Sequence, residues 1–241
     1  MMSNNPPRDK SITTWFKFQL PEDVLLDESL FHALHPTMKE WSHACYGRVK
    51  ESPQDCVLLL NWYRTRSWLN FSQSESYAEL LSSLGAHSDV PVVTEIIDFN
   101  RDYVTIALSS HTELKRVYFP SSISQETRRA VWDRVRHLAP SVAYGKKFQH
   151  RNPYIMGPSL GWVEEDVRWE GQEAVACVWV HKWKSQEIEE RFKATARYPH
   201  MKDGELIKPL TLDLFEQGLR DLGALGWEEC HVGFETHCYI P

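Results

Sequence analysis

Two copies of one stretch of sequence decide the fold, and they are Cys56-Val-Leu-Leu-Leu-Asn-Trp62 and Cys177-Val-Trp-Val-His-Lys-Trp183. Each run is short and mainly apolar, which is typical of a buried β-strand. In both copies the closing tryptophan is followed by a phenylalanine nine residues later and by a tyrosine six residues after that; these are Phe71 and Tyr77, then Phe192 and Tyr198. The shared spacing indicates an internal repeat.

Weaker echoes flank both copies in the same order. Tyr46-Gly47-Arg48 returns as Tyr144-Gly145-Lys146 upstream of the central run, and Thr94–Phe99 returns as Cys230–Glu235 downstream of it. Each echo is weak by itself. Because they occur in one order around the same central run, they support a chain that consists of two related halves.

The repeat predicts where the halves begin and end. A polar lead at 1–10, expected to be disordered, is followed by a first half-domain at 11–100 and a second at 101–241. The second copy is longer because of two insertions. One is a Pro/Gly-rich loop at 149–171, and the other, at about 201–226, holds an extra helix; long loops of this kind often bind ligands.

The expected elements follow the order β-α-β-β-α-β in both halves. In the first half they are strand 13–18, helix 28–43, strand 46–50, strand 56–63, helix 67–84 and strand 92–99. In the second half they are strand 103–109, helix 125–138, strand 142–148, strand 174–183, helix 186–198, extra helix 212–222 and strand 231–239. This is the order of a ferredoxin-like half-domain, whose sheet leaves one apolar face bare. A tandem copy covers that face, so the predicted fold class is α+β, with two tandem ferredoxin-like half-domains forming an intramolecular barrel.

Composition and charge narrow the class of function. The 241 residues are 42% apolar and carry a net charge of −6 with an isoelectric point near 6.0, which argues against nucleic acid and against a membrane surface as partners. No apolar run reaches the roughly 20 residues that cross a bilayer, and the polar lead is unlike a signal peptide. Five cysteines without paired spacing are expected to be reduced, so the predicted compartment is the cytoplasm.

With these strands that end in Trp62 and Trp183, the chain resembles the dimeric α/β-barrel (ferredoxin-like) superfamily, of the antibiotic-biosynthesis monooxygenase and polyketide-cyclase kind, in its tandem fungal form. In that family a strand ending in Trp or Phe precedes a helix that carries an aromatic residue. The resemblance covers nearly the whole chain, twice. It implies one cavity per half, between sheet and helices, and a protein that is either a pseudo-dimeric monomer or a homodimer.

The resemblance also implies which side chains line each cavity. On the central strand it selects Leu58, Leu60 and Trp62 in the first half, and Trp179, His181 and Trp183 in the second. On the last strand it selects Thr94 and Ile96, and His231 and Gly233. The catalytic Tyr of the family's polyketide cyclase falls on Phe71 and Phe192, and its catalytic His falls on Tyr77 and Tyr198. That Tyr–His pair is therefore absent from both halves.

The two predicted cavities differ in polarity. The first is mainly apolar, with Thr14, Thr94 and Tyr77 as its polar exceptions. The second contains His181 and His231. Because a buried, neutral histidine can give or take a proton near pH 7, the second cavity is predicted to be the reactive one. The predicted catalytic residues are His181, Tyr198 and His231. The predicted substrate-binding residues are Trp179, Trp183, Phe192, Gly233, Trp62 and Tyr77.

Plainer roles stay open for the histidines. His181 is also explained as a core residue bonded to Tyr198 or to the backbone, and His231 as an exposed residue at the start of a strand. His32 and His35 are three residues apart on one helix, but without a third ligand they predict no metal site. The sequence holds no nucleotide-binding motif and no nucleophile elbow, so no cofactor is predicted.

Together these features predict a cofactor-independent cyclase or isomerase, including a cycloaddition-type enzyme, acting on an apolar natural-product intermediate of secondary metabolism. Aromatic walls would hold such a small-molecule substrate in a folded conformer, and a donor aimed at a carbonyl would stabilise developing charge. Two alternatives stay open. One is a cofactor-free monooxygenase of a phenolic or anthrone substrate, and the other is a non-catalytic small-molecule-binding or stress-response protein.

Overall fold

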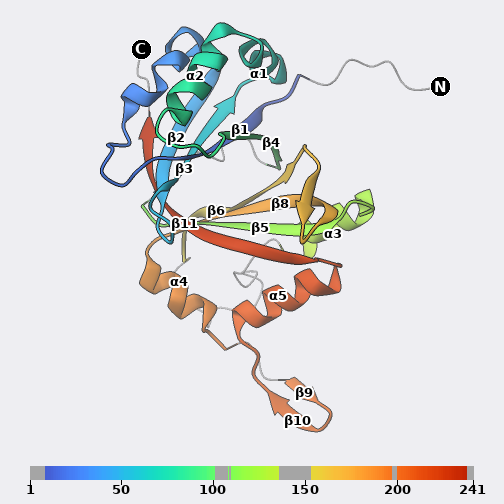
Figure 1. The fold of residues 1–241 in the computed structure, drawn as a ribbon. Coiled ribbons are helices and arrows are strands. Elements are labelled where there is room, and N and C mark those ends of the chain that lie inside the picture. Colours follow the sequence, from blue (N-terminus) through green and yellow to red (C-terminus); the bar gives the residue numbers. More distant parts are fainter. Residues whose placement is uncertain (1–8, 101–107, 109, 136–152, 197–199, 238–241) are drawn as a thin grey trace, which may run out of the picture. The chain divides into compact units, whose positions relative to one another are not determined.

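The computed structural model describes residues 9–100, 108, 110–135, 153–196 and 200–237 (Figure 1). The chain clusters into two compact units. Unit 1 comprises the residues up to Ser110 together with those from His231 onward, and unit 2 comprises His111–Cys230. Strand β11 (Gly226–His237) passes through the boundary, so it contributes residues to both units.

Unit 1 is built on an antiparallel sheet with the order β4-β1-β3-β2-β11. Its strands are β1 (Ile12–Gln19), β2 (Trp41–Val49), β3 (Asp55–Trp62), β4 (Val93–Phe99) and the second part of β11. Gly47 is required where β2 meets β11, because a Cβ atom there would lie 2.4 Å from the Gly233 carbonyl oxygen. The last described strand therefore packs against an early one at a position that only glycine fits.

The helices of unit 1 are a 3-10 helix, η1 (Glu28–Thr37), and the α-helices α1 (Thr65–Ser72) and α2 (Glu75–Gly85). The expected helix 67–84 is divided, because Ser74 accepts a hydrogen bond from the Tyr77 N–H and starts a new helix. The expected helix 28–43 is wrong beyond Thr37, since the stretch contains Pro36 and the chain enters β2 at Trp41.

Unit 2 has β8 (Gln172–Trp183) at the centre of its sheet, with β5 (Thr112–Pro120) along one edge of it and β6 (Tyr154–Val163) and β7 (Val167–Trp169) along the other. Strand β5 is also a neighbour of β11. Just before β11 begins, the Leu225 N–H donates to the Tyr118 carbonyl of β5. The helices are α3 (Gln125–Val135), α4 (Gln186–Lys193) and α5 (Thr211–Asp221), and β9 (His200–Lys202) and β10 (Glu205–Ile207) form a hairpin.

The expected loop at 149–171 is wrong, because most of its described part forms β6 and β7. Glu170 and Gly171 both have positive φ, 48° and 82°, and they form the two-residue turn that joins β7 to β8. The expected helix 186–198 ends at Lys193. The expected strand 142–148 and nearly all of the expected strand 103–109 lie outside the described residues. The expected extra helix matches α5.

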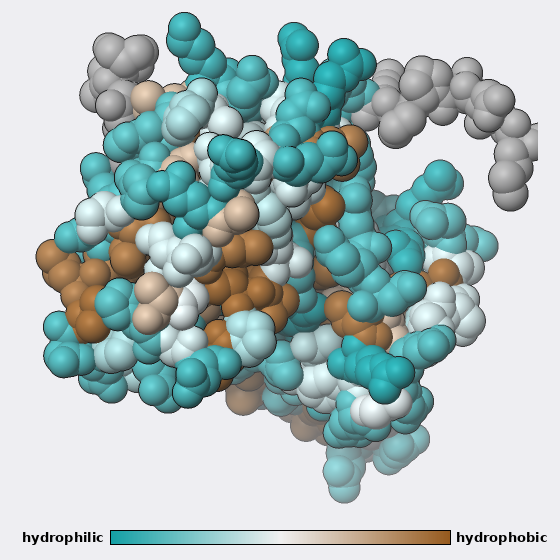
Figure 2. All heavy atoms as spheres, turned by 45° about the horizontal axis from the view of Figure 1, so that its top comes forward, coloured by the Kyte–Doolittle hydropathy of each residue, from teal (hydrophilic) through white to brown (hydrophobic). Residues whose placement is uncertain are grey.

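The surface is mixed, and Figure 2 shows brown apolar patches set among hydrophilic side chains on the face that it draws. Exposed large apolar residues include Leu25, Met201 and Leu206. None of the helices that the structure describes is long and apolar enough to cross a membrane.

Candidate active site

The centre of unit 2 is an aromatic core over one face of β8. Side chains alternate along a strand, so Trp179, His181 and Trp183 share a face, and all three are wholly buried. The Phe215 ring of α5 lies edge-on, 5.7 Å from the ring of Trp179 and 6.1 Å from that of His181. Tyr154 of β6 stacks 5.9 Å from His181. His181 is therefore surrounded by aromatic rings.

An acidic residue that the sequence analysis did not select faces His181 from the next strand. Glu113 of β5 pairs with His181 in the strand register, and the histidine Nδ1 lies 3.2 Å from the Glu113 Oε2. The Trp183 indole N–H donates to the same oxygen over 2.8 Å. Lys193 of α4 donates to the other oxygen over 3.0 Å. Glu113 is fully buried, and three side chains from two other elements hold its carboxylate.

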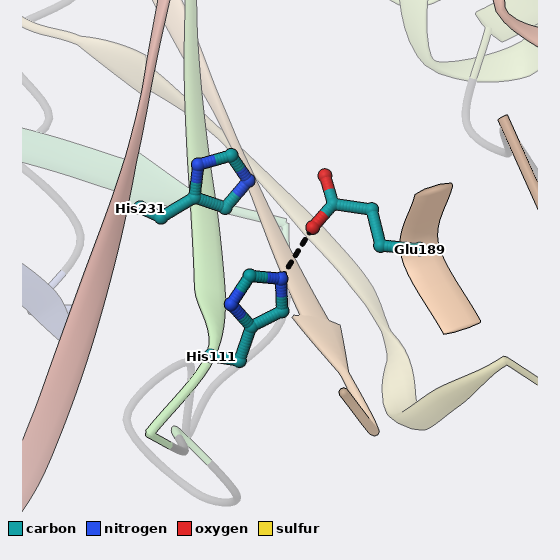
Figure 3. A group of neighbouring side chains, drawn as sticks. All are labelled: His111, Glu189 and His231. Carbon is teal, nitrogen blue, oxygen red and sulfur yellow. Dashed lines mark hydrogen bonds and ion pairs between the residues drawn. The ribbon is translucent and has the colours of Figure 1, made fainter. Parts of the chain in front are cut away.

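The ionic contacts continue beyond Glu113. Lys193 also contacts Glu189, one helical turn earlier on α4, with 2.6 Å between Nζ and Oε1. The other oxygen of Glu189 lies 2.5 Å from Nε2 of His111, and Figure 3 shows these two side chains pointing toward one another. We call this series the buried charge chain. It consists of His181, Glu113, Lys193, Glu189 and His111.

The buried charge chain fixes the charges of Glu113 and Lys193. Burial raises the pKa of Glu113, but the charges of His181, Lys193 and Lys115 outweigh burial and hold that pKa well below the usual carboxyl value. Burial lowers the pKa of Lys193, but the carboxylates of Glu113 and Glu189 outweigh it and raise that pKa. Glu113 is therefore an anion and Lys193 a cation across the neutral pH range.

Three buried nitrogen atoms over β8 lack hydrogen-bond partners among the described residues. They are Nε1 of Trp179 and both ring nitrogens of His181, of which Nδ1 lies 3.2 Å from the Glu113 carboxylate without forming a hydrogen bond. Unsatisfied groups of this kind are rare in protein cores and often mark a functional position. In the neutral tautomer that carries its proton on Nδ1, facing Glu113, the imidazole would present Nε2 as a proton acceptor. The arrangement is that of a general base oriented by a carboxylate.

The other sequence-predicted residues lie in different places. Phe192 of α4 packs 6.0 Å from Trp183 and so belongs to the same core. His231 belongs to unit 1, where its ring contacts Glu51 at 2.5 Å and its backbone N–H donates to the same carboxylate. Gly233 also belongs to unit 1, on β11 opposite Arg48. Tyr198 lies outside the described residues.

Trp62 and Tyr77 lie in the aromatic core of unit 1. The Trp62 indole N–H donates to Thr14 over 2.9 Å, and the Tyr77 hydroxyl donates to Thr94 over 3.2 Å. Thr14 pairs with Leu60 in the strand register, as Glu113 pairs with His181. The closing tryptophan thus bonds to the equivalent residue of the neighbouring strand in both units.

Glu113 could have been found by extending the internal repeat to the first strand of each unit. Thr14 is two residues after Ile12, and Glu113 is two residues after His111 at the start of a second alternating stretch. The strand of the second half was predicted at 103–109 instead, so Glu113 was not matched to Thr14. The predicted absence of a metal and of a cofactor stays a prediction.

Comparison with known proteins identifies related folds but no family. No family model and no curated protein matches the chain. An anthrone oxidase-like protein of known structure is 13% identical, with a TM-score of 0.54 over 96% of this chain and 94% of that one. A candidate monooxygenase from Lactobacillus acidophilus NCFM is 7% identical, with a TM-score of 0.51 over 95% and 97% of the two chains. A candidate monooxygenase from Fusobacterium nucleatum is 6% identical, with a TM-score of 0.50 over 96% and 95%. At these identities the likeness shows an α+β fold related to monooxygenase-like proteins.

Proposed function

We propose that this chain is a cofactor-independent enzyme that removes a proton from an apolar, carbonyl-activated small molecule, with His181 as the base. The consequence of proton removal is cyclisation or isomerisation of a natural-product intermediate. The working form is a cytoplasmic monomer or homodimer. The observation that carries this proposal is the orphaned Nε2 of His181, fully buried among aromatic rings, with the Glu113 carboxylate behind it.

The surroundings of His181 suit this chemistry. A base works best when its pKa is close to the working pH, and general-base catalysis typically contributes about 10²–10⁴-fold in rate. The Glu113 carboxylate faces Nδ1 of the imidazole, and the charge of Lys193 helps to keep Glu113 ionised. Trp179, Trp183 and Phe215 supply apolar faces against which a planar substrate can pack. His181 is enclosed in this structure, and we propose that a substrate reaches Nε2 by displacing the Phe215 ring, which contacts both Trp179 and His181.

The strand orders support a tandem origin for the two units. Unit 1 has the order β4-β1-β3-β2, and in unit 2 β5 lies next to β8, which lies next to β6. In unit 1 the first and third strands are neighbours, as the ferredoxin-like order requires, and unit 2 follows the same order when the three-residue strand β7 is left out. We infer from this that the units are tandem ferredoxin-like copies, of which the second holds the catalytic residues.

A cofactor-free oxygenase is the second candidate, favoured by the fold likeness to an anthrone oxidase-like protein and to candidate monooxygenases. The first step is the same. His181 removes a proton from the methylene of an anthrone, and dioxygen then adds at that carbon; one oxygen atom becomes the new carbonyl, and the other leaves as water with the two methylene hydrogens. The two candidates therefore share a base and differ in whether oxygen is consumed.

The test uses anthrone as a probe of proton removal. Under anaerobic conditions in deuterated buffer, the protein should accelerate deuterium incorporation at the methylene carbon, followed by NMR. His181→Met should lower that rate by about 100-fold or more. The matched control is Leu60→Met, the same replacement at the equivalent register position of unit 1, which should leave the rate unchanged.

Aerobic measurements then separate the two candidates. Oxygen uptake with an anthraquinone product would favour the oxygenase, whereas exchange without oxygen uptake would favour a cyclase or isomerase. Equal exchange rates in the wild type and in His181→Met would remove His181 from the role of base.

A further inference from the structure

We infer that Lys115 and Trp179 form an oxyanion site beneath Phe215, which binds the oxygen atom on which negative charge develops when His181 removes a proton. The substrate class that this site selects is a planar aromatic phenol or an enolisable aryl ketone. This inference rests on the proposed function, because it assigns the partner of the same base.

Lys115 is a cation in an unusual position. Its side chain is fully buried, on the same strand and the same face as Glu113. Nζ lies 5.6 Å from the centroid of the Phe215 ring and 5.5 Å from that of Trp227, so the ammonium contacts aromatic faces. One carboxylate, that of Glu229, accepts a hydrogen bond from it over 2.8 Å.

The ammonium has capacity for a further partner. A lysine offers three N–H donors, and the contacts recorded for Lys115 use one of them in a hydrogen bond. Glu229 is 44% exposed, so water solvates that carboxylate and weakens its hold on the cation. An anion placed on the buried side of Lys115 would not face the same competition from water.

Phe215 lies next to all three groups of the proposed site. Its ring contacts the rings of Trp179 and His181 and the ammonium of Lys115. Lys115 pairs with Trp179 in the strand register, and His181 is two residues along β8, so Lys115 and His181 are diagonal neighbours. Such neighbours lie about 7–8 Å apart at the backbone, within reach of long side chains. A ligand that replaces the Phe215 ring meets all three.

The chemistry of those groups is complementary. Nε2 of His181 accepts a proton from carbon or from a phenol, and the released electron pair moves through the conjugated system to the oxygen. That oxygen becomes an oxyanion, which accepts hydrogen bonds from the Lys115 ammonium and from the orphaned Trp179 indole N–H. No electron leaves the substrate in this step, and the proton is held on the imidazole. Donors fixed in advance around a developing charge are a large source of catalysis.

The test is anion binding by the intact protein, with 4-nitrophenol as the probe and neutral 4-nitroanisole as its matched control. The visible band of the phenolate reports the bound anion directly. Wild type should bind the phenolate more tightly than the anisole and lower the pKa of the bound phenol. Lys115→Met should weaken phenolate binding by about tenfold or more and leave anisole binding unchanged, because a hydrogen bond to a charged group is lost.

Two further variants keep the test decisive if Lys115→Met folds poorly. Lys115→Arg keeps the cation and should keep the preference for the phenolate. Glu229→Gln removes the competing carboxylate and should tighten phenolate binding. Equal phenolate affinity in wild type, in Lys115→Met and in Glu229→Gln would overturn the oxyanion site.

The outcome is independent of the base assignment, because the binding measurement needs no turnover. Anion binding that depends on Lys115 in a protein that exchanges no proton from anthrone would leave this site standing and remove the proposed function. Proton exchange that depends on His181 without any effect of Lys115→Met on phenolate binding would do the reverse.

Discussion

The two units place very different side chains in equivalent positions beneath their closing tryptophan. In unit 1, Trp62 bonds to Thr14, and Leu60 occupies the register position opposite. In unit 2, Trp183 bonds to Glu113, and His181 is opposite. Six residues beyond each tryptophan, Trp68 on α1 corresponds to Glu189 on α4, and both are buried.

This difference shows that equivalent buried positions can accommodate either aromatic rings or linked charges. In unit 1 the space is filled by rings, with Trp68 5.8 Å from Trp62 and 5.6 Å from Tyr77. In unit 2 it is filled by the buried charge chain, in which each carboxylate lies between two nitrogen-bearing groups. Charges can be buried at these positions because they are linked to one another. Under the proposed function, the polar layer of unit 2 is the one that supplies the reactive groups.

The largest effect should come from breaking the centre of the charge chain. Glu113→Leu leaves Lys193 and His181 buried with too few partners, so we expect a loss of about 3–5 kcal/mol in the free energy of unfolding. Thr14→Val removes one hydrogen bond at the equivalent position and should cost about 1 kcal/mol. Urea unfolding followed by tryptophan fluorescence measures both. Similar losses in the two variants would contradict the contrast between the units.

The outer pair of the charge chain gives a sharper form of the same comparison. Glu189→Leu removes a buried carboxylate that contacts both His111 and Lys193, and should cost about 2–3 kcal/mol. The double variant His111→Leu/Glu189→Leu makes the layer resemble that of unit 1 and should recover part of this loss. Additive losses from His111→Leu and Glu189→Leu in a double-mutant cycle would show that the two residues are not coupled.

Acid should weaken unit 2 before unit 1. The pKa of Glu113 is lowered in the folded state, so the stability that Glu113 contributes is complete above its usual value of 4.5 and is lost as the pH falls through the folded value. Amide hydrogen exchange of β8 should therefore accelerate below pH 4.5 relative to that of β3. Glu113→Gln should abolish this difference in pH dependence. An identical acid response in both strands of the wild type would argue against the prediction.

The sequence was sufficient where burial and hydrophobicity agree. The alternating or apolar runs of β1, β3 and β8 were predicted to within about two residues, and His181 was predicted to lie among Trp179 and Trp183. The pairing of these strands into two units follows from contacts between distant residues, which local patterns do not contain.

Strands β5 and β6 were not predicted, because they contain residue types that are usually found at the surface or in turns. β5 contains Glu113, Lys115 and Arg116, all of them buried, and charged residues are normally read as surface. β6 contains Gly157 and Pro158, which fall where its register with β8 shifts between Met156 and Ser159. The partners of the buried charges are distant in the sequence, so the buried charge chain was the part of the candidate site that the sequence did not predict.

The smallest effect should appear at the start of the two equivalent helices. Ser185 caps α4 by accepting from the Ile188 N–H, whereas Arg64, at the same distance from its tryptophan, gives α1 no side-chain cap. Ser185→Ala should cost about 1 kcal/mol, and Arg64→Ala should stay within about 0.5 kcal/mol. Thermal unfolding measures both. Arg64→Ser should raise stability slightly, and a decrease would show that α1 starts differently from α4.

Strand β11 has a consequence for how the protein is made. Its residues from His231 onward belong to unit 1 and pair with β2, so unit 1 draws on both early and late parts of the chain. On the ribosome, the edge of β2 stays open until all of unit 2 has been synthesised. An open strand edge is a template for pairing with other chains. The newly made first half is thus the stage at which we expect this protein to depend most on chaperones.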